Sequence, residues 1–556
     1  MRHRVRSRGV LRWLRAMEDW TEVTSESDWR KKIMFHRRMV PLSILLTMIV
    51  FGVIHSSLGA QEQATGGPER RPDCTSLTGL QIPNVQITEA VAVGVPATGA
   101  IKVAHCRVSG VIDREIHFAE LLPDRWNERL FSGGGGGFVG AVANQAQTSI
   151  NFGYATVGTD TGHQGAGTDA SWALNNRQRQ LNYAYLAIHR TTEVAKSVVK
   201  AYYGVNPRYS YFYGCSNGGR QALMEAQRYP ADFDGLVSCA PALDFTNIAA
   251  AFVRNTKVTF PDPNALREPT ITPDNLKLLE SKVLEACDSR DGVKDGVLGD
   301  PRACPFKVAD LPLCSTDRPA ADCVTRTQRA AIERIYAPTT GGGGVIYPGQ
   351  PFGGEGQPAG WQAWITGINT QLSTSTQGQA PSLQFAFGTD FFKYFVFGRK
   401  DWDYSTYDLS RWREDTRTTA SILNADSPDL SAFKARGGKL ILAHGWADPA
   451  LNPLSTIAYY ERVQARDARL RDYVRLFMMP GVLHCAGGPG PDSVDWFAPI
   501  AEWVERAQAP ERVLAQKLGP DGGVLNAHPL CPYPLRAVYD GKGITTDAAS
   551  YTCKAP

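Results

Sequence analysis

The stretch YSYFYGCSNGGRQALMEAQRYP, residues 209–230, constrains the fold of this chain more than any other. Residues 209–213 are short and aromatic, as expected for a buried strand. Residues 214–218 fit the pattern G-x-S-x-G, and helix-forming residues with apolar spacing follow from Gln221. Strand, glycine-flanked turn and helix together form a nucleophile elbow, which exposes a serine hydroxyl above the end of a sheet. The pattern alone also fits a plain glycine-rich turn, but its context favours an elbow with Ser216 as nucleophile.

Predicted strands and helices alternate along most of the chain. The strands are residues 115–122, 130–132, 154–158, 235–240, 439–445 and 474–479, and the helices are residues 178–202, 453–465 and 494–507. Such alternation is typical of a mostly parallel, doubly wound sheet. Together with the elbow it predicts the α/β class, with an α/β-hydrolase fold divided between residues 61–244 and 405–556.

Residues 245–404 interrupt this alternation. They are rich in proline and glycine, contain four cysteines, and carry many aromatic residues in their second half. An insertion of this kind between sheet strands is usually a lid over the active site. Most of its aromatic side chains are expected to form the core of the lid itself.

Residues 1–60 have the features of a leader with a signal peptide. The apolar run 40–54 follows basic residues and precedes small residues that end at Ala60. It is shorter than the roughly 18–20 apolar residues of a membrane span. We therefore predict cleavage near Ala60, export to the periplasm or the extracellular space, and no stable membrane insertion afterwards; an uncleaved anchor is the alternative. The long polar stretch before Met34 favours Met34 or Met39 as the true start.

The cysteines and the charge also limit the function classes. All eleven cysteines follow Ala60, in agreement with an oxidising compartment. Eleven is an odd number, so at least one thiol stays unpaired, and we expect it to be Cys239 in a buried strand. The net charge of +4 comes without a basic patch interleaved with aromatic residues, which argues against nucleic-acid binding. The sequence does not indicate an oligomeric state.

The order of residues in α/β-hydrolases places an acid and then a histidine after the serine. Three histidines follow Ser216, namely His444, His484 and His528. His484 lies just past the last predicted strand, whereas His444 ends a strand and is interpreted as structural or pocket-lining. Asp448 lies on the loop after that same strand. Ser216, Asp448 and His484 are therefore the predicted triad for acyl transfer.

Two further features accompany this set. Cys215 precedes the serine and Cys485 follows the histidine, so catalytic contact would bring these cysteines within disulfide range. A Cys215–Cys485 bond would hold nucleophile and base together. The glycine run 133–137 lies upstream of the elbow and, with Asn217, is interpreted as the oxyanion hole; a flexible loop is the alternative.

The segment CDSRDGVKDGV, residues 287–297, suits a hard cation. Its aspartates Asp288, Asp291 and Asp295 are separated by glycines, and carboxylates and backbone carbonyls are calcium ligands. The flanking Cys287 and Cys304 could close this loop. An acidic surface turn is the alternative interpretation.

Taken together, these motifs resemble the tannase/feruloyl esterase family, which includes the mono(hydroxyethyl) terephthalate hydrolase. The resemblance covers nearly the whole chain after the leader and rests on residues 214–235, 287–297, 437–448, 480–490 and 529–534. It implies the same triad and the Cys215–Cys485 bond, with Gly137 and Asn217 as oxyanion donors. It further implies structural Ca²⁺ bound by Asp288, Asp291, Asp295 and the carbonyls of Val293 and Val297. The other implied disulfides are Cys74–Cys106, Cys287–Cys304, Cys314–Cys323 and Cys531–Cys553.

The resemblance also bears on the substrate. It implies that Trp364 lines an aromatic acyl pocket. The terephthalate hydrolase of the family uses a lid arginine to bind its substrate's carboxylate, but residues 365–398 of this chain contain no arginine. We therefore expect an exported serine esterase for small aromatic esters with an uncharged phenolic acyl group, such as galloyl or feruloyl. A terephthalate monoester hydrolase, another acyl hydrolase, and a non-catalytic calcium-stabilised binding protein are the alternatives.

Overall fold

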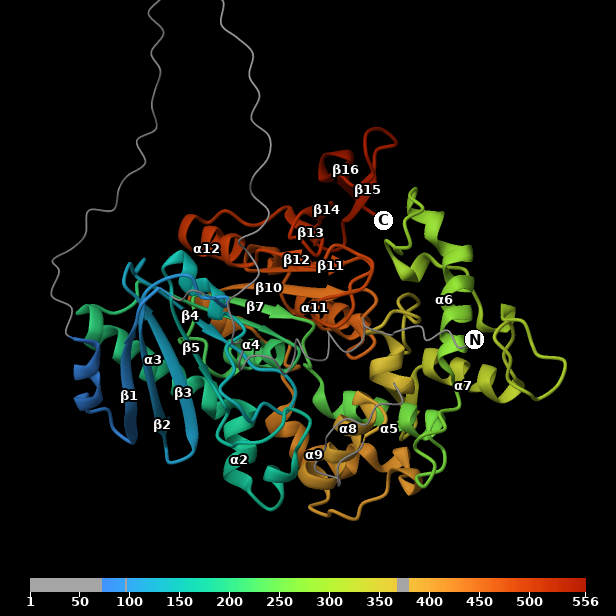
Figure 1. The fold of residues 1–556 in the computed structure, drawn as a ribbon, viewed down its shortest axis with the longest axis horizontal. Coiled ribbons are helices and arrows are strands. Elements are labelled where there is room, and N and C mark those ends of the chain that lie inside the picture. Colours follow the sequence, from blue (N-terminus) through green and yellow to red (C-terminus); the bar gives the residue numbers. More distant parts are fainter. Residues whose placement is uncertain (1–72, 96–97, 368–379) are drawn as a thin grey trace, which may run out of the picture. The chain divides into compact units, whose positions relative to one another are not determined.

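A nine-stranded sheet with strand order β1-β2-β3-β5-β4-β6-β7-β10-β11 forms the centre of the fold (Figure 1). The computed structural model describes residues 73–556 except 96–97 and 368–379, so the predicted leader lies outside the described residues. The strands are β1 (Val85–Val93), β2 (His105–Ile112), β3 (Ile116–Pro123), β4 (Arg129–Gly133), β5 (Ala155–Thr159), β6 (Tyr209–Cys215), β7 (Gly235–Cys239), β10 (Lys439–Gly445) and β11 (Val474–Met479). From β5 to β11 every neighbouring pair is parallel, as predicted, whereas β1, β2, β3 and β5 pair in antiparallel fashion.

Helices cover both faces of the sheet, with α12 on one side and α3 and α4 on the other (Figure 1). The helices outside the inserted region are α2 (Arg177–Leu181), α3 (Ala187–Tyr203), α4 (Asn217–Arg228), α9 (Trp412–Leu423), α10 (Ser431–Ala435), α11 (Pro453–Arg466) and α12 (Phe497–Arg506). A π-helical turn, Asn182–Leu186, joins α2 to α3. The predicted helix 178–202 is thus one helical stretch with a wide turn near its start.

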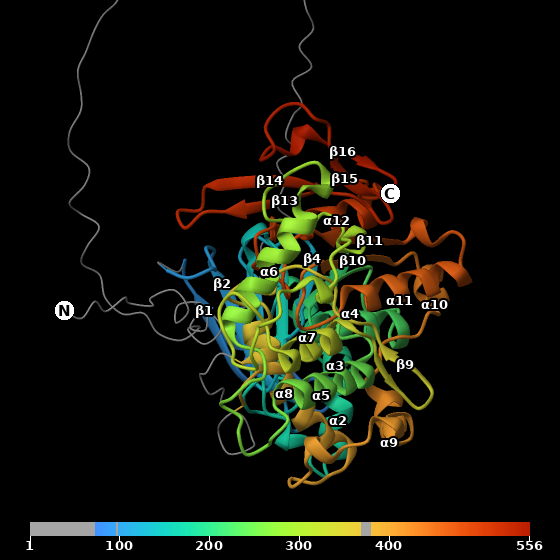
Figure 2. The same ribbon diagram turned by 90° about the vertical axis from the view of Figure 1, so that its right-hand side faces the viewer.

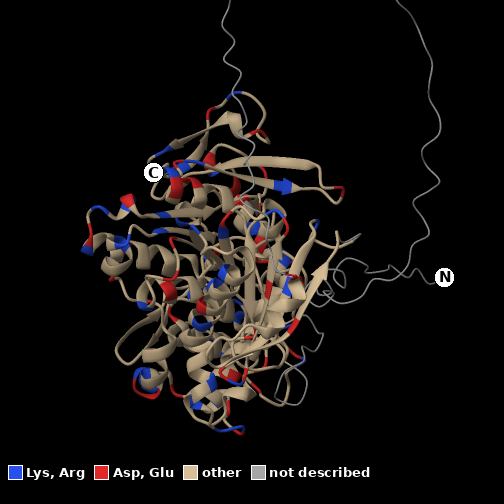
Figure 3. Cartoon of the chain, turned by 90° about the vertical axis from the view of Figure 1, so that its left-hand side faces the viewer, with Lys and Arg blue, Asp and Glu red and all other residues tan. Residues whose placement is uncertain are grey.

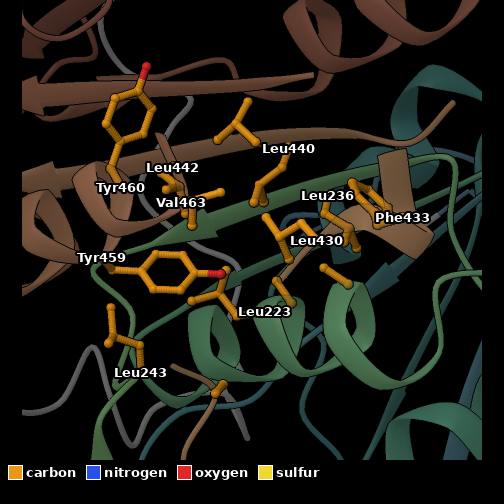
Figure 4. Close-up of a cluster of buried hydrophobic side chains, with 14 of the residues drawn as sticks. Leu223, Leu236, Leu243, Leu430, Phe433, Leu440, Leu442, Tyr459, Tyr460 and Val463 are labelled. Atoms are coloured by element: carbon orange, nitrogen blue, oxygen red, sulfur yellow. The ribbon is translucent and has the colours of Figure 1, made fainter. Parts of the chain in front are cut away.

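Leucines and aromatic rings from the sheet and from α4 and α11 form one continuous core (Figure 4). Leu236 pairs with Phe212 on one side and Leu440 on the other, so the apolar side chains of three strands share one face. Leu223 of α4 and Leu442 of β10 are fully buried there. Truncating either to alanine costs about 2–5 kcal/mol of stability.

The inserted region is mainly helical. It contains α5 (Phe245–Thr259), α6 (Pro273–Cys287), α7 (Arg326–Tyr336), α8 (Leu383–Asp390) and the hairpin of β8 (Thr339–Gly341) and β9 (Gly344–Tyr347). Helix α5 packs against α7 and α8 (Figure 2). The aromatic residues of this region divide between two clusters. Phe306 and Trp361 lie in a core made of residues within 258–365, as expected for a core of the region itself. Phe391 and Phe395 instead pack with Phe138 and Tyr183 from the other part of the chain.

The C-terminal region contains strands that the sequence analysis did not predict. They are β12 (Ser493–Val494), β13 (Val513–Leu518), β14 (Val524–Leu530), β15 (Arg536–Tyr539) and β16 (Tyr551–Lys554). These strands are short, and many of their side chains are exposed or half-buried. Their apolar alternation is therefore too weak to be recognised from the sequence.

All five expected disulfides are present, with Cα–Cα distances between 5.0 and 5.9 Å. Cys239 is the free, buried cysteine among the described residues, as predicted. Burial raises the pKa of its thiol to about 12. No helix in the described part of the chain is both long and apolar enough to cross a membrane. Lysine and arginine are interspersed with aspartate and glutamate on the face shown in Figure 3.

Candidate active site

Ser216 lies in a strained turn between β6 and α4. Its φ of 64° is in the left-handed region, where a non-glycine residue is uncommon. The flanking Gly214 and Gly218 have no room for a side chain. A Cβ on Gly214 would lie 2.3 Å from the Gly218 backbone, and one on Gly218 would lie 2.3 Å from the Gln145 side chain. The G-x-S-x-G pattern therefore forms the predicted elbow.

Parallel strands bring three side chains to one edge of the sheet. Asp448 follows β10 and His484 follows β11, and these strands are in register from Leu440↔Val474 to Gly445↔Met479. Ser216 Oγ lies 2.9 Å from His484 Nε2. His484 Nδ1 lies 2.8 Å from Asp448 Oδ2. The structure thus brings together the three residues that the sequence predicted as a triad, in the geometry that acyl transfer needs.

Asp448 is buried and fully hydrogen-bonded. Its Oδ1 accepts from the backbone N–H groups of Ala450 and Leu451, at 2.8 and 2.9 Å. Burial alone would raise its pKa, but the nearby His484 and a hydrogen bond from His444 outweigh burial and lower it. The carboxylate therefore stays ionised and orients the His484 ring.

His444, interpreted from the sequence as structural or pocket-lining, contacts Asp448 directly. Its Nε2 lies 3.2 Å from Asp448 Oδ2 and 2.9 Å from the Leu451 carbonyl. Its Nδ1 lies 2.8 Å from Thr456 Oγ1. Because Nε2 faces two acceptors, it carries the proton. The one feature of the sequence that points to this contact is the position of His444 at the end of a strand, four residues before Asp448.

The Cys215–Cys485 disulfide joins the residue before the serine to the residue after the histidine, with Cα atoms 5.9 Å apart. It links β6 to the loop after β11, two segments separated by 270 residues. Gln145 also holds the elbow, since its Oε1 accepts from the Cys215 N–H at 2.8 Å. Nothing in the sequence singled out Gln145.

Gly137 and Asn217 line the same cavity as Ser216. Asn217 is the first residue of α4, so its backbone N–H has no partner within the helix. Gly137 has a φ of 53°, and a Cβ there would lie 2.4 Å from the Gly167 carbonyl oxygen. Only glycine fits at this approach to the serine.

The cavity beside the serine has a volume of about 40 Å³. Apart from Ser216, Asn217 and His484, the described residues that line it are apolar or glycine: Gly137, Ala242, Phe245, Ile248, Ala249, Phe252, Trp364, Phe387 and Leu451. The Trp364 ring meets the His484 ring edge to face at 4.8 Å. Phe387 stacks on Trp364 at 6.1 Å. Trp364 therefore lies against both the histidine and the cavity.

The acidic segment forms a compact loop distant in sequence from the triad. Asp288 accepts from the N–H groups of Asp295 and Gly296, and Asp291 from those of Val293 and Gly299. Burial, with the neighbouring Asp295 and Asp288, raises the pKa of Asp291 to about 6. A cavity is lined by Asp291, Asp295, Val293 and Val297. Within the described residues, however, no three acidic, histidine or cysteine side chains are grouped closely enough to hold a metal ion.

Comparison with known proteins agrees with this architecture. An uncharacterized esterase of Xanthomonas campestris pv. campestris is 34% identical over 86% of this chain and 91% of its own length. The mono(2-hydroxyethyl) terephthalate hydrolase of Piscinibacter sakaiensis is 31% identical over 83% of this chain and 86% of its own. The crystal structure of feruloyl esterase B from Aspergillus oryzae superposes with a TM-score of 0.77 and 27% identity, over 86% of this chain and 99% of that one.

These similarities confirm the predicted α/β-hydrolase fold and the activity class of a carboxylic ester hydrolase. The family described as tannase and feruloyl esterase matches residues 100–554. The chain belongs to the tannase and feruloyl esterase family.

Proposed function

We propose that this chain is an exported serine esterase that hydrolyses esters of phenolic acids, such as galloyl or feruloyl esters. The observation that carries the proposal is the Ser216–His484–Asp448 hydrogen-bond chain, in which Ser216 and His484 line an apolar cavity. His484 takes the Ser216 proton as Oγ attacks the ester carbonyl, and Asp448 stabilises the imidazolium. The N–H groups of Gly137 and Asn217 bind the oxyanion. His484 then protonates the leaving alcohol, and water hydrolyses the acyl-enzyme by the reverse proton path.

The lining of the cavity supports an uncharged aromatic acyl group. Trp364, Phe387, Phe245 and Phe252 surround the space beside Ser216, and flat rings pack well against such side chains. No lysine or arginine lines the cavity within the described residues. A free carboxylate would lose its hydration there without gaining a counter-charge.

A terephthalate monoester is the second candidate, because one relative is a hydrolase of that ester. The two candidates differ in one charge on the acyl ring. The test is hydrolysis by the chain from Gln61 of methyl gallate, methyl ferulate and mono(2-hydroxyethyl) terephthalate, with Ser216→Ala as the blank. We expect a preference for one phenolic ester. A preference for the terephthalate ester would mean that another group holds its carboxylate.

Structural Ca²⁺ in the acidic loop is part of the proposal. Its ligands would be the carboxylates of Asp288, Asp291 and Asp295 with the carbonyls of Val293 and Val297, a set of hard oxygen donors. In the described structure these three carboxylates are not grouped closely enough to hold an ion as they stand, so binding would have to draw them together. The raised pKa of Asp291 reflects burial and repulsion among these carboxylates, which a cation would relieve. The ion would neutralise the loop and take no part in ester cleavage. Calcium should therefore raise the melting temperature, and an equal melting temperature with chelator would contradict the assignment.

Export is proposed from the leader and from the five disulfides. N-terminal sequencing of the protein recovered outside the cytoplasm tests it, with cleavage near Ala60 as the expected result. A non-catalytic binding protein remains the contrasting class. It would turn over none of the esters, and its Ser216 would not react with a fluorophosphonate.

A further inference from the structure

Arg220 is a fully buried cation on the helix that follows the nucleophile. Its Nη1 donates to the Ala184 and Leu423 carbonyls, at 2.7 and 3.3 Å, and its Nη2 to the Tyr183 carbonyl at 2.9 Å. Its Nε donates to Asn217 Oδ1 at 2.8 Å. None of these partners is a carboxylate. Burying a guanidinium without a counter-charge is costly, so this arrangement calls for a functional reason.

The first connection runs from Arg220 to the glycine loop through Asn217. The Asn217 side chain accepts from Arg220 and donates its Nδ2 to the Gly135 carbonyl at 3.1 Å. On the same loop residue, the Gly135 N–H donates to Gln221 Oε1 at 3.1 Å. The loop is therefore tied to the first turn of α4, where one oxyanion donor lies.

The second connection runs through Tyr183. The Arg220 guanidinium lies 5.0 Å from the centroid of the Tyr183 ring, a cation–π distance. The Tyr183 hydroxyl donates to the Gly137 carbonyl at 2.9 Å. Burial raises the pKa of Tyr183, so the hydroxyl remains a neutral donor. On the other side of Gly137, the Gly136 carbonyl accepts from the Val139 N–H at 3.0 Å. Both peptide groups next to Gly137 are thus fixed.

The local backbone explains how one side chain reaches so many acceptors. Tyr183 and Ala184 lie in the π-helical turn Asn182–Leu186. Such wide turns shift the backbone hydrogen-bonding pattern and occur frequently at functional sites. Here the carbonyls of both residues accept hydrogen bonds from Arg220.

We propose that Arg220 is a positioning residue that joins the two halves of the oxyanion hole, Asn217 on α4 and Gly137 on the glycine loop. Arg220 is three residues after Asn217, about 4.5 Å along the helix axis, and its charged side chain reaches back to the Asn217 side chain, with Nε 2.8 Å from Oδ1. In the protein interior that charge adds to the positive potential at the start of α4 and favours the oxyanion. The inference rests on the proposed serine-esterase mechanism and adds a residue to it.

The test uses Arg220→Met, Tyr183→Phe and a matched control, Arg228→Met. Arg228 lies on the same helix, stacks over the Tyr185 ring at 4.5 Å and donates to the Ser421 carbonyl at 2.8 Å, but it is exposed and belongs to no oxyanion element. For each purified protein we would measure kcat and KM on an ester that the wild type hydrolyses. We would also measure the rate of Ser216 labelling by a fluorophosphonate, whose phosphoryl oxygen occupies the oxyanion hole of the adduct.

We expect kcat to fall about 100-fold in Arg220→Met and about tenfold in Tyr183→Phe, with the labelling rate falling in parallel and KM within about twofold. Arg228→Met should match the wild type. Wild-type kcat and labelling rates in both test variants, or equal losses in Arg228→Met, would overturn the inference. If Arg220→Met does not fold, Tyr183→Phe decides alone. A wild-type protein that neither hydrolyses esters nor reacts at Ser216 would instead refute the proposed function.

Discussion

Removing the Cys215–Cys485 disulfide should lower catalysis more than it disturbs the rest of the fold. The change is the double substitution Cys215→Ala with Cys485→Ala. The bond closes a loop over a separation of 270 residues, and the chain-entropy estimate for such a loop is about 5–6 kcal/mol of stability. The same bond also holds the Ser216 turn beside the His484 loop, where Oγ and Nε2 are 2.9 Å apart. A shift of about 1 Å in such a contact costs about 100-fold in rate.

A second disulfide supplies the control. Cys74–Cys106 has a similar Cα–Cα distance, 5.7 Å, and closes a loop over a separation of 32 residues, where it ties the 3-10 helix Cys74–Gly79 to β2 in the antiparallel part of the sheet. Its double alanine variant should lose about 4 kcal/mol by the same estimate, with an unchanged kcat. The assay is kcat per folded molecule well below the melting temperature, with folded protein counted by near-UV circular dichroism. Full kcat in the Cys215/Cys485 variant, or equal kcat losses in the two variants, would refute the reasoning.

Three further substitutions test individual contacts. Gly137→Ala should lower kcat about 100-fold with little change in KM. The added Cβ would lie 2.4 Å from the Gly167 carbonyl oxygen, so the backbone that carries the oxyanion donor would have to shift. A wild-type kcat in steady-state kinetics would contradict this. His444→Phe removes a donor to Asp448 Oδ2, so Asp448 should orient the His484 ring less firmly and kcat should fall with little change in KM. A wild-type kcat in steady-state kinetics would make His444 purely structural. Burial raises the pKa of Glu355 from 4.5 to about 6. The buried carboxyl must ionise as the pH rises from about 4.5 past 6, so the folded state should lose about 2 kcal/mol of stability over that range. Glu355→Gln should then become the more stable protein above pH 6 by urea denaturation, whereas a pH-independent difference would contradict the assignment.

The triad was predictable because its signals are local and mutually consistent. Ser216 lies in a strand–turn–helix motif, Asp448 and His484 each follow a strand, and cysteines flank two of the three. Parallel strands carry their carboxyl ends to one edge of the sheet, so sequence order was enough to bring these residues together.

The contacts around the triad were not predictable from the sequence in the same way. In the sequence Arg220 is not distinguished from any other helix residue. Its burial depends on a π-helical turn 36 to 37 residues earlier and on the Leu423 carbonyl 203 residues later. From the sequence, His444 is only the last part of a predicted strand. Its contact with Asp448 depends on the packing of α11, which supplies Thr456 as the partner of His444 Nδ1. Such contacts are set by tertiary packing rather than by local pattern. The same holds for Phe387 and Phe395 of the inserted region, whose rings pack against Phe138 from the other part of the chain.

The most direct test of the central claim is the site of covalent labelling by a fluorophosphonate. The folded protein, with and without Ser216→Ala, would be treated with the probe and digested, and the modified peptide identified by mass spectrometry. We expect stoichiometric modification at Ser216 and none in the alanine variant. Labelling at another residue, or no labelling of folded wild-type protein, would contradict the assignment of Ser216 as the nucleophile.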